Sequence, residues 1–210
     1  MRAILKSLGR ALVLGAATAS VIGLAAAPAL AATTWTVKPG GAVTGTAGTT
    51  TVTDTTASPP LTVTCTSSVF KGTLKKGSGL AGKSIGTFSS LAFNSCTADN
   101  VTLSVTLTAK MPLNAVKYNS TKKTASMTVS GLKGTLSVTG ICSATIAGTT
   151  ATTGGTVHAT WANKTSTLTV LTTGSTLHLY NDSCPITATG DAINFTGAFK
   201  FAPKTTITSP

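Results

Sequence analysis

The chain contains no Glu and no Gln, and its only two Arg, Arg2 and Arg10, lie close to the N-terminus. Beyond residue 31 all positive charge is carried by Lys, and all negative charge by four Asp. Glu, Gln and Arg are good helix formers, so their absence argues against helices. It also removes many of the usual catalytic acids and every side chain that clamps an anion through two parallel hydrogen bonds. The composition therefore restricts the fold more than it restricts the function.

Thr is the commonest residue beyond residue 31 and makes up about a quarter of that region. Because Thr is β-branched, it fits a pleated strand better than a helix. In residues 101–108, apolar residues alternate with Ser and Thr at period two, which predicts a strand with one buried and one wet face. Apolar residues also alternate with Thr in residues 61–65, and Ile, Phe or Gly occupies every second position of residues 193–201. The sequence predicts an all-β protein, an antiparallel β-sandwich or two packed sheets, with no substantial helix after the signal peptide.

Two further expectations concern the arrangement of strands. Residues 157–161, 168–170 and 177–179 alternate in the same way and are separated by turn residues, which predicts a three-stranded meander. Residues 40–57 contain few large apolar side chains, so we expect an edge strand or a loosely held arm there.

The N-terminus has the pattern of an export signal. Arg2, Lys6 and Arg10 accompany an apolar run over residues 11–24, and Ala29-Leu30-Ala31 supplies the small residues of a cleavage site. We expect a signal peptide over residues 1–31, followed by a single all-β domain over residues 32–210. The product is expected to be secreted, extracellular or associated with the cell wall, without stable insertion in a membrane once the signal is removed.

The four cysteines are an even number, which in an exported chain predicts two disulfides formed in an oxidising compartment. Three pairings are possible, and we favour Cys65–Cys96 and Cys142–Cys184 because each pair brackets its own set of strands. Segments 93–96 and 180–184 are alike, which is compatible with two related halves over about 60–118 and 124–203. Chance similarity in so biased a composition explains the likeness equally well.

The mature region is basic. Subtracting Arg2, Lys6 and Arg10 from the sixteen basic residues leaves thirteen Lys against four Asp, a net charge of +9. A field of that sign favours polyanions, so cell-wall polyanions or other envelope components are the expected partners. With no Arg and few aromatic residues to stack bases, we expect no nucleic-acid binding. The scattered Lys also fit a surface that serves only to keep the protein soluble.

One segment matches a catalytic motif. Residues 82–86 read Gly-Lys-Ser-Ile-Gly, the G-x-S-x-G of α/β hydrolases, in which the serine stands on a strand-to-helix turn. Such an enzyme would use Ser84 as nucleophile, His158 or His178 as base, and an aspartate such as Asp182 as the orienting acid. A predicted strand follows the motif in place of a helix, so we expect no catalytic residue here.

The remaining candidate sites are weaker. His158 and His178 lie at polar positions of strands that the meander separates by a third strand, and no two cysteines are spaced as zinc ligands. We therefore expect no metal site and no cofactor. Trp161 is in phase with apolar neighbours, which favours the core. Trp35 lies near the start of the mature chain, and we expect it to be exposed and available for binding.

Four segments carry a resemblance to a known group of proteins: residues 35–40 (Trp-Thr-Val-Lys-Pro-Gly), 61–67 (Leu-Thr-Val-Thr-Cys-Thr-Ser), 93–96 (Phe-Asn-Ser-Cys) and 207–210 (Ile-Thr-Ser-Pro). In these the chain resembles small secreted Thr- and Gly-rich all-β proteins of actinobacteria with four cysteines. The resemblance spans the mature region and implies secretion and an all-β fold, without an established activity. More distantly, the layout is similar to secreted proteins that activate alkane oxidation, and this likeness carries no catalytic residues onto the sequence.

The sequence thus predicts a secreted, non-catalytic β-protein with an extracellular or envelope-associated binding role, whose partner is polyanionic or a hydrophobic surface. One alternative is a secreted ester or lipid hydrolase that uses Ser84. The other is a structural surface-coat protein that assembles through its Thr-rich strands.

Overall fold

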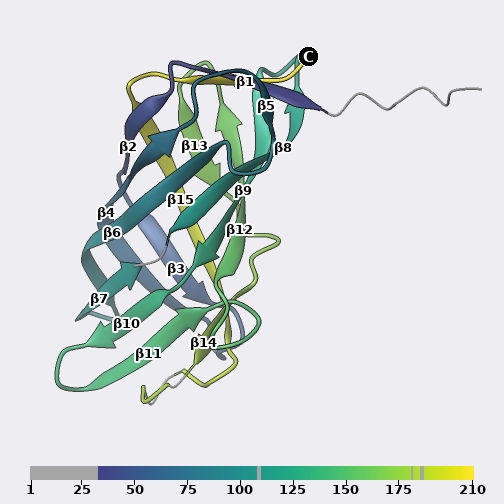
Figure 1. Ribbon diagram of the computed structural model, residues 1–210. Helices are drawn as coiled ribbons and strands as arrows, with labels where there is room; N and C mark the ends of the chain where they lie inside the picture. Colours follow the sequence, from purple (N-terminus) through teal and green to yellow (C-terminus); the bar gives the residue numbers. More distant parts are fainter. Residues whose placement is uncertain (1–32, 108–109, 181, 185–186) are drawn as a thin grey trace, which may run out of the picture. The chain divides into compact units, whose positions relative to one another are not determined.

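A computed structural model describes residues 33–107, 110–180, 182–184 and 187–210, so the predicted signal peptide lies outside the described residues. The described residues form sixteen strands and no helix, which confirms the all-β prediction (Figure 1). None of them belongs to a helix with the length and apolarity needed to cross a membrane. In chain order the strands are β1 (Thr34–Lys38), β2 (Gly41–Ala47), β3 (Thr50–Asp54), β4 (Leu61–Leu74), β5 (Gly77–Ala81), β6 (Gly86–Ala98), β7 (Val101–Leu107), β8 (Met111–Asn119), β9 (Thr124–Leu132), β10 (Gly134–Val138), β11 (Cys142–Ala147), β12 (Gly155–Ala162), β13 (Thr167–Val170), β14 (Leu177–Tyr180), β15 (Ala192–Ala202) and β16 (Thr206–Thr208).

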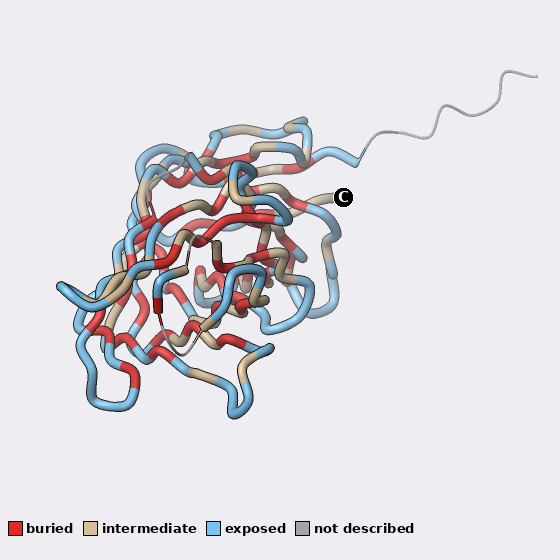
Figure 2. Tube along the Cα trace, turned by 90° about the horizontal axis from the view of Figure 1, so that it is seen from below, coloured by how far each residue is buried: buried red, intermediate tan, exposed pale blue. Residues whose placement is uncertain are grey.

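The alternation of apolar and hydroxyl residues decides which face of each strand is buried. In β7, Leu103, Val105 and Leu107 are buried, whereas the Ser and Thr between them are exposed. Buried and exposed residues alternate in this way along many of the strands (Figure 2). On the wet face, hydroxyl groups of neighbouring strands pair directly, as Ser104 and Ser137 do at 2.8 Å.

Thirteen strands form one antiparallel sheet that closes on itself twice. The upper ring pairs its eight strands in the order β15, β13, β12, β9, β8, β6, β4, β2 and back to β15. The lower ring pairs eight strands in the order β15, β3, β4, β6, β7, β10, β11, β14 and back to β15. The words upper and lower refer to the orientation of Figure 1, in which β8 and β9 lie in the upper half and β10, β11 and β14 lie at the bottom.

Three long strands, β4, β6 and β15, belong to both rings. Each changes its neighbour partway along, as β15 does when it pairs with β3 over residues 193–196 and with β13 over residues 197–200. The rings are therefore continuous with each other. Each ring also takes strands from both predicted halves, 60–118 and 124–203, and a relation between those halves stays a prediction.

Aromatic side chains fill the upper ring. Phe70 contacts Phe88 and Phe199 with ring centroids 4.6 and 4.5 Å apart, and Phe201 lies 5.2 Å from Trp161. All five are buried, which confirms the core position predicted for Trp161.

A separate three-stranded sheet, in the order β16, β1, β5, contributes its own buried residues. The expectation that Trp35 is exposed is wrong, because its side chain is only 1% exposed. It shares the inner face of β1 with Val37 and meets Tyr118 edge-on at 6.5 Å. Alternation along β1, which places Trp35 and Val37 on one face, is the physical reason for its burial.

Two predictions about strand arrangement are also wrong. β14 does not complete a meander with β12 and β13, since it pairs with β11 and β15 in the lower ring. Residues 40–57 are neither an edge nor a loose arm, because β2 and β3 each pair on both sides, with β4 and β15. The small side chains of β2 have a packing reason, since a Cβ at Gly45 would lie 2.5 Å from the ring of Phe201.

Both predicted disulfides are present. Cys65–Cys96 joins directly opposed residues of β4 and β6, and Cys142–Cys184 joins the start of β11 to the loop between β14 and β15. Two structural disulfides are typical of proteins that fold in an oxidising, extracellular-type environment.

Candidate ligand-binding site

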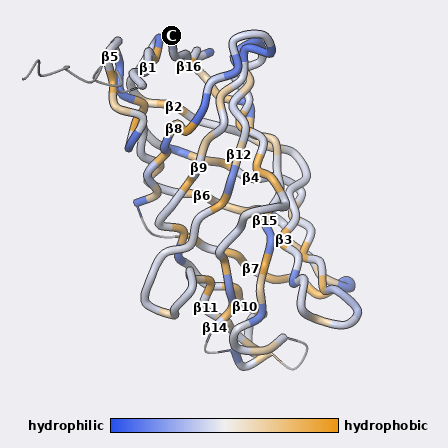
Figure 3. Tube along the Cα trace, turned by 90° about the vertical axis from the view of Figure 1, so that its right-hand side faces the viewer, coloured by the Kyte–Doolittle hydropathy of each residue, from blue (hydrophilic) through white to orange (hydrophobic). Residues whose placement is uncertain are grey.

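The lower ring encloses an apolar cavity of about 220 Å³. Each of its eight strands contributes at least one lining residue, and the walls are chiefly aliphatic, with Val63, Leu103, Leu179 and Ile193 among them. Hydrophobic residues recur around β10, β11 and β14 (Figure 3). The cavity therefore belongs to the ring as a whole and not to a single loop.

The side chains that line the cavity explain why space remains inside the lower ring. A closed ring of eight strands encloses just enough room for side chains to fill it or for one small ligand. Five aromatic residues occupy the upper ring, whereas no aromatic residue lines the cavity of the lower ring. Val, Leu and Ile are too small to fill the same cross-section, so space remains.

The mouth of the cavity exposes apolar surface to water. Val101 and Ile141 both line it, with 45% and 70% of their side chains exposed. Beside the mouth lies a more polar outer hollow, bounded by the β3–β4 loop and the β14–β15 loop. Cavity and hollow share Leu61, Asp99 and Thr187, so the hollow leads into the cavity.

All four aspartates of the chain gather at this mouth. Asp54 and Asp99 line the cavity, Asp191 lines the outer hollow, and Asp182 bonds to Thr187, which lines both. The thirteen lysines of the described part lie elsewhere, on the three-stranded sheet, on strands of the upper ring, or on the loops that join these elements to the rest of the fold. They are Lys38, Lys71, Lys75, Lys76, Lys83, Lys110, Lys117, Lys122, Lys123, Lys133, Lys164, Lys200 and Lys204.

Asp54 is the most deeply buried of these acids, with 3% of its surface exposed. Its Oδ1 accepts hydrogen bonds from the backbone N–H and hydroxyl of Thr56, both at 2.9 Å, and from the N–H of Ala57 at 3.0 Å. Its Oδ2 is buried and has no hydrogen-bond partner among the described residues. Asp54 therefore ends β3 by closing a turn with one oxygen and leaves the other unsatisfied at the cavity.

Asp191 lies on the β14–β15 loop, across the outer hollow from the turn that Asp54 closes. Its Oδ2 accepts a 2.6 Å hydrogen bond from the N–H of Ala188. That bond is the main reason why the pKa of Asp191 is lowered; burial opposes it, and the side chains of Thr56 and Asp54 lower the pKa further. The two loops are also joined by the 2.9 Å bond from the Thr55 N–H to the carbonyl of Ala192.

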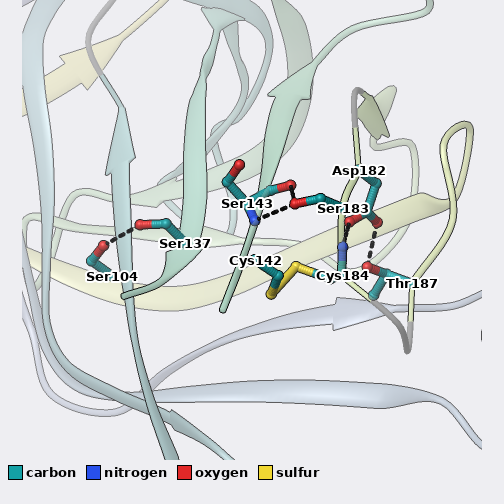
Figure 4. Close-up of a disulfide and its surroundings, with 8 residues drawn as sticks. All are labelled: Ser104, Ser137, Cys142, Ser143, Asp182, Ser183, Cys184 and Thr187. Carbon is teal, nitrogen blue, oxygen red and sulfur yellow. Dashed lines mark hydrogen bonds between the residues drawn. A yellow bond between two sulfur atoms is a disulfide. The ribbon is translucent and has the colours of Figure 1, made fainter. Parts of the chain in front are cut away.

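The disulfide Cys142–Cys184 anchors the β14–β15 loop, which carries Asp182 and Asp191, to the lower ring (Figure 4), and both of its cysteines line the cavity. Asp182, which was a candidate catalytic acid, accepts a 2.7 Å bond from the Cys184 N–H through Oδ1 and a bond from the Thr187 hydroxyl through Oδ2. Ser183 adds a 2.9 Å bond from the N–H of Ser143 to its hydroxyl. Asp182 thus shapes the loop between β14 and β15.

The structure does not bring the residues of the predicted triad together. Ser84 lies between β5 and β6 with a φ of 51°, and its N–H donates to the Asn114 side chain at 2.8 Å. His158 is exposed on β12 opposite Thr128, which itself lies opposite Asn114, so two strand spacings of about 4.8 Å separate His158 from Asn114. His178 lies on β14 of the lower ring.

Within the described ranges, no hydrogen bond joins Ser84 to His158, His178 or Asp182. The strand β6 follows the serine directly, so the strand-to-helix turn of a hydrolase is not formed. Comparisons of the chain with protein-family models, with curated proteins and with solved structures give no match.

Proposed function

We propose that this is a secreted, non-catalytic binding protein whose lower ring takes an apolar ligand, or the apolar part of a larger partner. The observation that carries the proposal is the cavity of about 220 Å³ with Ile141 and Val101 exposed at its mouth. Exposed apolar side chains beside an unfilled apolar space are costly in water, and a bound apolar group would cover both.

The size of the cavity limits the ligand. An apolar cavity of about 150 Å³ binds benzene, so 220 Å³ suits a chain or ring system of roughly eight to ten carbon atoms. A larger partner would have to leave its remaining part in the outer hollow.

The distribution of charge supports association with the cell envelope. The lysines surround the upper ring and the three-stranded sheet, whereas the cavity lies in the lower ring. A cell-wall polyanion held by those lysines would leave the mouth of the cavity free to meet its ligand.

Calorimetric titration with octan-1-ol tests the proposal. Octan-1-ol is uncharged and short enough for the cavity, so we expect saturable binding to the native protein. Val138→Trp places a large side chain at the half-buried cavity wall and is expected to abolish that binding. The matched control is Val116→Trp, on β8 and 60% exposed, which should bind like the native protein. Absence of binding to the native protein, or equal binding by both variants, would contradict the proposal.

The two alternative functions have less support. The hydrolase needs a base beside Ser84, and in the described residues the hydrogen bond of that serine is the one from its N–H to Asn114. A coat protein needs free strand edges, and closure of the large sheet leaves the outer strands β5 and β16 of the three-stranded sheet as the free edges of the described fold.

A further inference from the structure

We propose that the ligand of the lower ring carries a protonated amine on an apolar chain, and that the buried carboxylate of Asp54 is the counter-ion of that amine. This inference rests on the proposed function, since it names the chemical class of ligand that the cavity would take.

The Oδ2 oxygen of Asp54 is buried without a hydrogen-bond partner among the described residues. A buried carboxylate oxygen without a donor is expensive, and such a group in a folded protein calls for a partner. Its Oδ1 is fully used by Thr56 and Ala57, but its Oδ2 has no partner in the described chain, and the residue lines the cavity. A donor carried by the ligand would supply the missing hydrogen bond, and a charged donor would also balance the carboxylate.

Acidic side chains give the mouth of the cavity a negative electrostatic potential. Asp99 and Asp191 lie beside the opening, and Asp182 is bonded to Thr187 on its rim. No lysine of the described chain lies on a strand segment of the lower ring. The surroundings therefore attract a cation and repel a carboxylate, although the protein as a whole is basic.

The donor set excludes an inorganic cation as the natural occupant. Calcium takes six to eight oxygen ligands, whereas the cavity offers the carboxylates of Asp54 and Asp99 within walls that are chiefly aliphatic. Among the described residues, no three His, Cys, Asp or Glu side chains are grouped so that they could hold a metal ion. An organic cation fits both parts of the site, with its chain among the aliphatic residues and its amine at Asp54.

A proton is the competing occupant. Asp191 lies on the loop that is joined to the end of β3 by the bond from the Thr55 N–H to the Ala192 carbonyl, so a proton shared between the carboxyl groups of Asp54 and Asp191 would also satisfy Oδ2. Such a pair would have no preference for a charged ligand, and a ligand series therefore separates the two cases.

The test compares octylammonium, octan-1-ol and octanoate by calorimetry at pH 7 on the protein with both disulfides formed. The three compounds have the same chain length and differ in head-group charge. We expect octylammonium to bind about tenfold more tightly than octan-1-ol, as one charge-assisted hydrogen bond predicts, and octanoate to bind most weakly. Asp54→Asn keeps an oxygen that can accept the three turn bonds, and it should remove the preference for octylammonium while octan-1-ol affinity changes less than about twofold.

Asp99→Asn is the matched control, because it removes the same unit of charge from an exposed turn at the mouth. We expect it to lower octylammonium affinity by less than about threefold, as is usual for an exposed charge. Octylammonium binding no more tightly than octan-1-ol, or unchanged preference in Asp54→Asn, would overturn the inference and leave the proposed function intact. If none of the three compounds binds, the proposed function fails and this inference with it. The ligand series on the native protein distinguishes these outcomes even if Asp54→Asn does not fold.

Discussion

The side chain of Asn163 makes a pair of hydrogen bonds with the backbone of Ile207. Asn163 Nδ2 donates to the Ile207 carbonyl at 2.8 Å, and the Ile207 N–H donates to Asn163 Oδ1 at 2.7 Å. Both bonds are buried, and they join the end of β12 in the upper ring to β16 of the three-stranded sheet. Asn163 therefore holds the C-terminal strand against the ring.

Asn163→Ala is expected to lower the free energy of unfolding by about 2–4 kcal/mol, because it leaves a buried N–H and a buried carbonyl without partners. Urea unfolding measures this directly. Asn94→Ala, which removes one exposed 3.2 Å bond to Ser67, is the matched control and should change stability by less than about 0.5 kcal/mol. Equal losses in the two variants would contradict the role of Asn163.

Gly45→Ala is expected to destabilise the upper ring by about 1–3 kcal/mol, because the added methyl group would overlap the ring of Phe201. Gly48→Ala is the control, since a Cβ there meets nothing within 4 Å. Combining Gly45→Ala with Phe201→Leu should recover part of the loss, as a double-mutant cycle would show. A fully additive cycle would mean that the two positions do not interact.

The two disulfides should contribute similarly to stability and differently to binding. Their sequence separations of 31 and 42 residues correspond to about 4 kcal/mol each in the loop-entropy account. Replacing Cys142 and Cys184 together by Ser should also weaken octan-1-ol binding, since both line the cavity and Cys184 anchors the β14–β15 loop. Replacing Cys65 and Cys96, which do not line it, should leave the affinity of the folded protein unchanged. The same loss of affinity in both double variants would contradict this assignment.

The lowered pKa of Asp191 makes a prediction about acid stability. A carboxyl group whose pKa is lower in the folded state binds protons more readily in the unfolded state. It therefore adds stability above its ordinary value of 3.8, and that contribution is lost as the pH falls through the lower folded pKa.

Asp191→Asn should make the free energy of unfolding depend less on pH in this acidic range. Urea unfolding at intervals between about pH 2.5 and 6 measures this dependence. Asp99→Asn is the charge-matched control. A curve for Asp191→Asn that runs parallel to the native one across the window would contradict the assignment.

Local alternation made the strands predictable, because period-two burial depends only on neighbours in the chain. The pairing of Cys142 with Cys184 was predictable for a similar reason, as each disulfide closes a loop of consecutive strands. The same alternation places Trp35 and Val37 on one face of β1, and it could have predicted the burial of Trp35. The nearness of Trp35 to the start of the mature chain suggested exposure instead.

Ring closure could not be predicted in this way, because it depends on pairings between distant segments such as Thr51 with Thr196. The cavity depends on closure, so it was missed as well. Asp54 gave a visible turn signal in Asp-Thr-Thr-Ala, but its burial follows from the loop that carries Asp191, which lies more than a hundred residues away in sequence. The gathering of all four aspartates could likewise be seen only once the rings were known.

The sharing of β4, β6 and β15 between the rings has a consequence for how the protein can be handled and how it could evolve. No cut in the chain separates the lower ring, which holds the cavity, from the upper ring. The binding site therefore cannot be isolated as a module or transplanted to another scaffold. The rings share these three strands and the β4–β6 pairing, and we expect residues 33–210 to unfold in a single cooperative transition. A substitution of a buried phenylalanine in the upper ring should thus also change the structure at the mouth of the cavity in the lower ring.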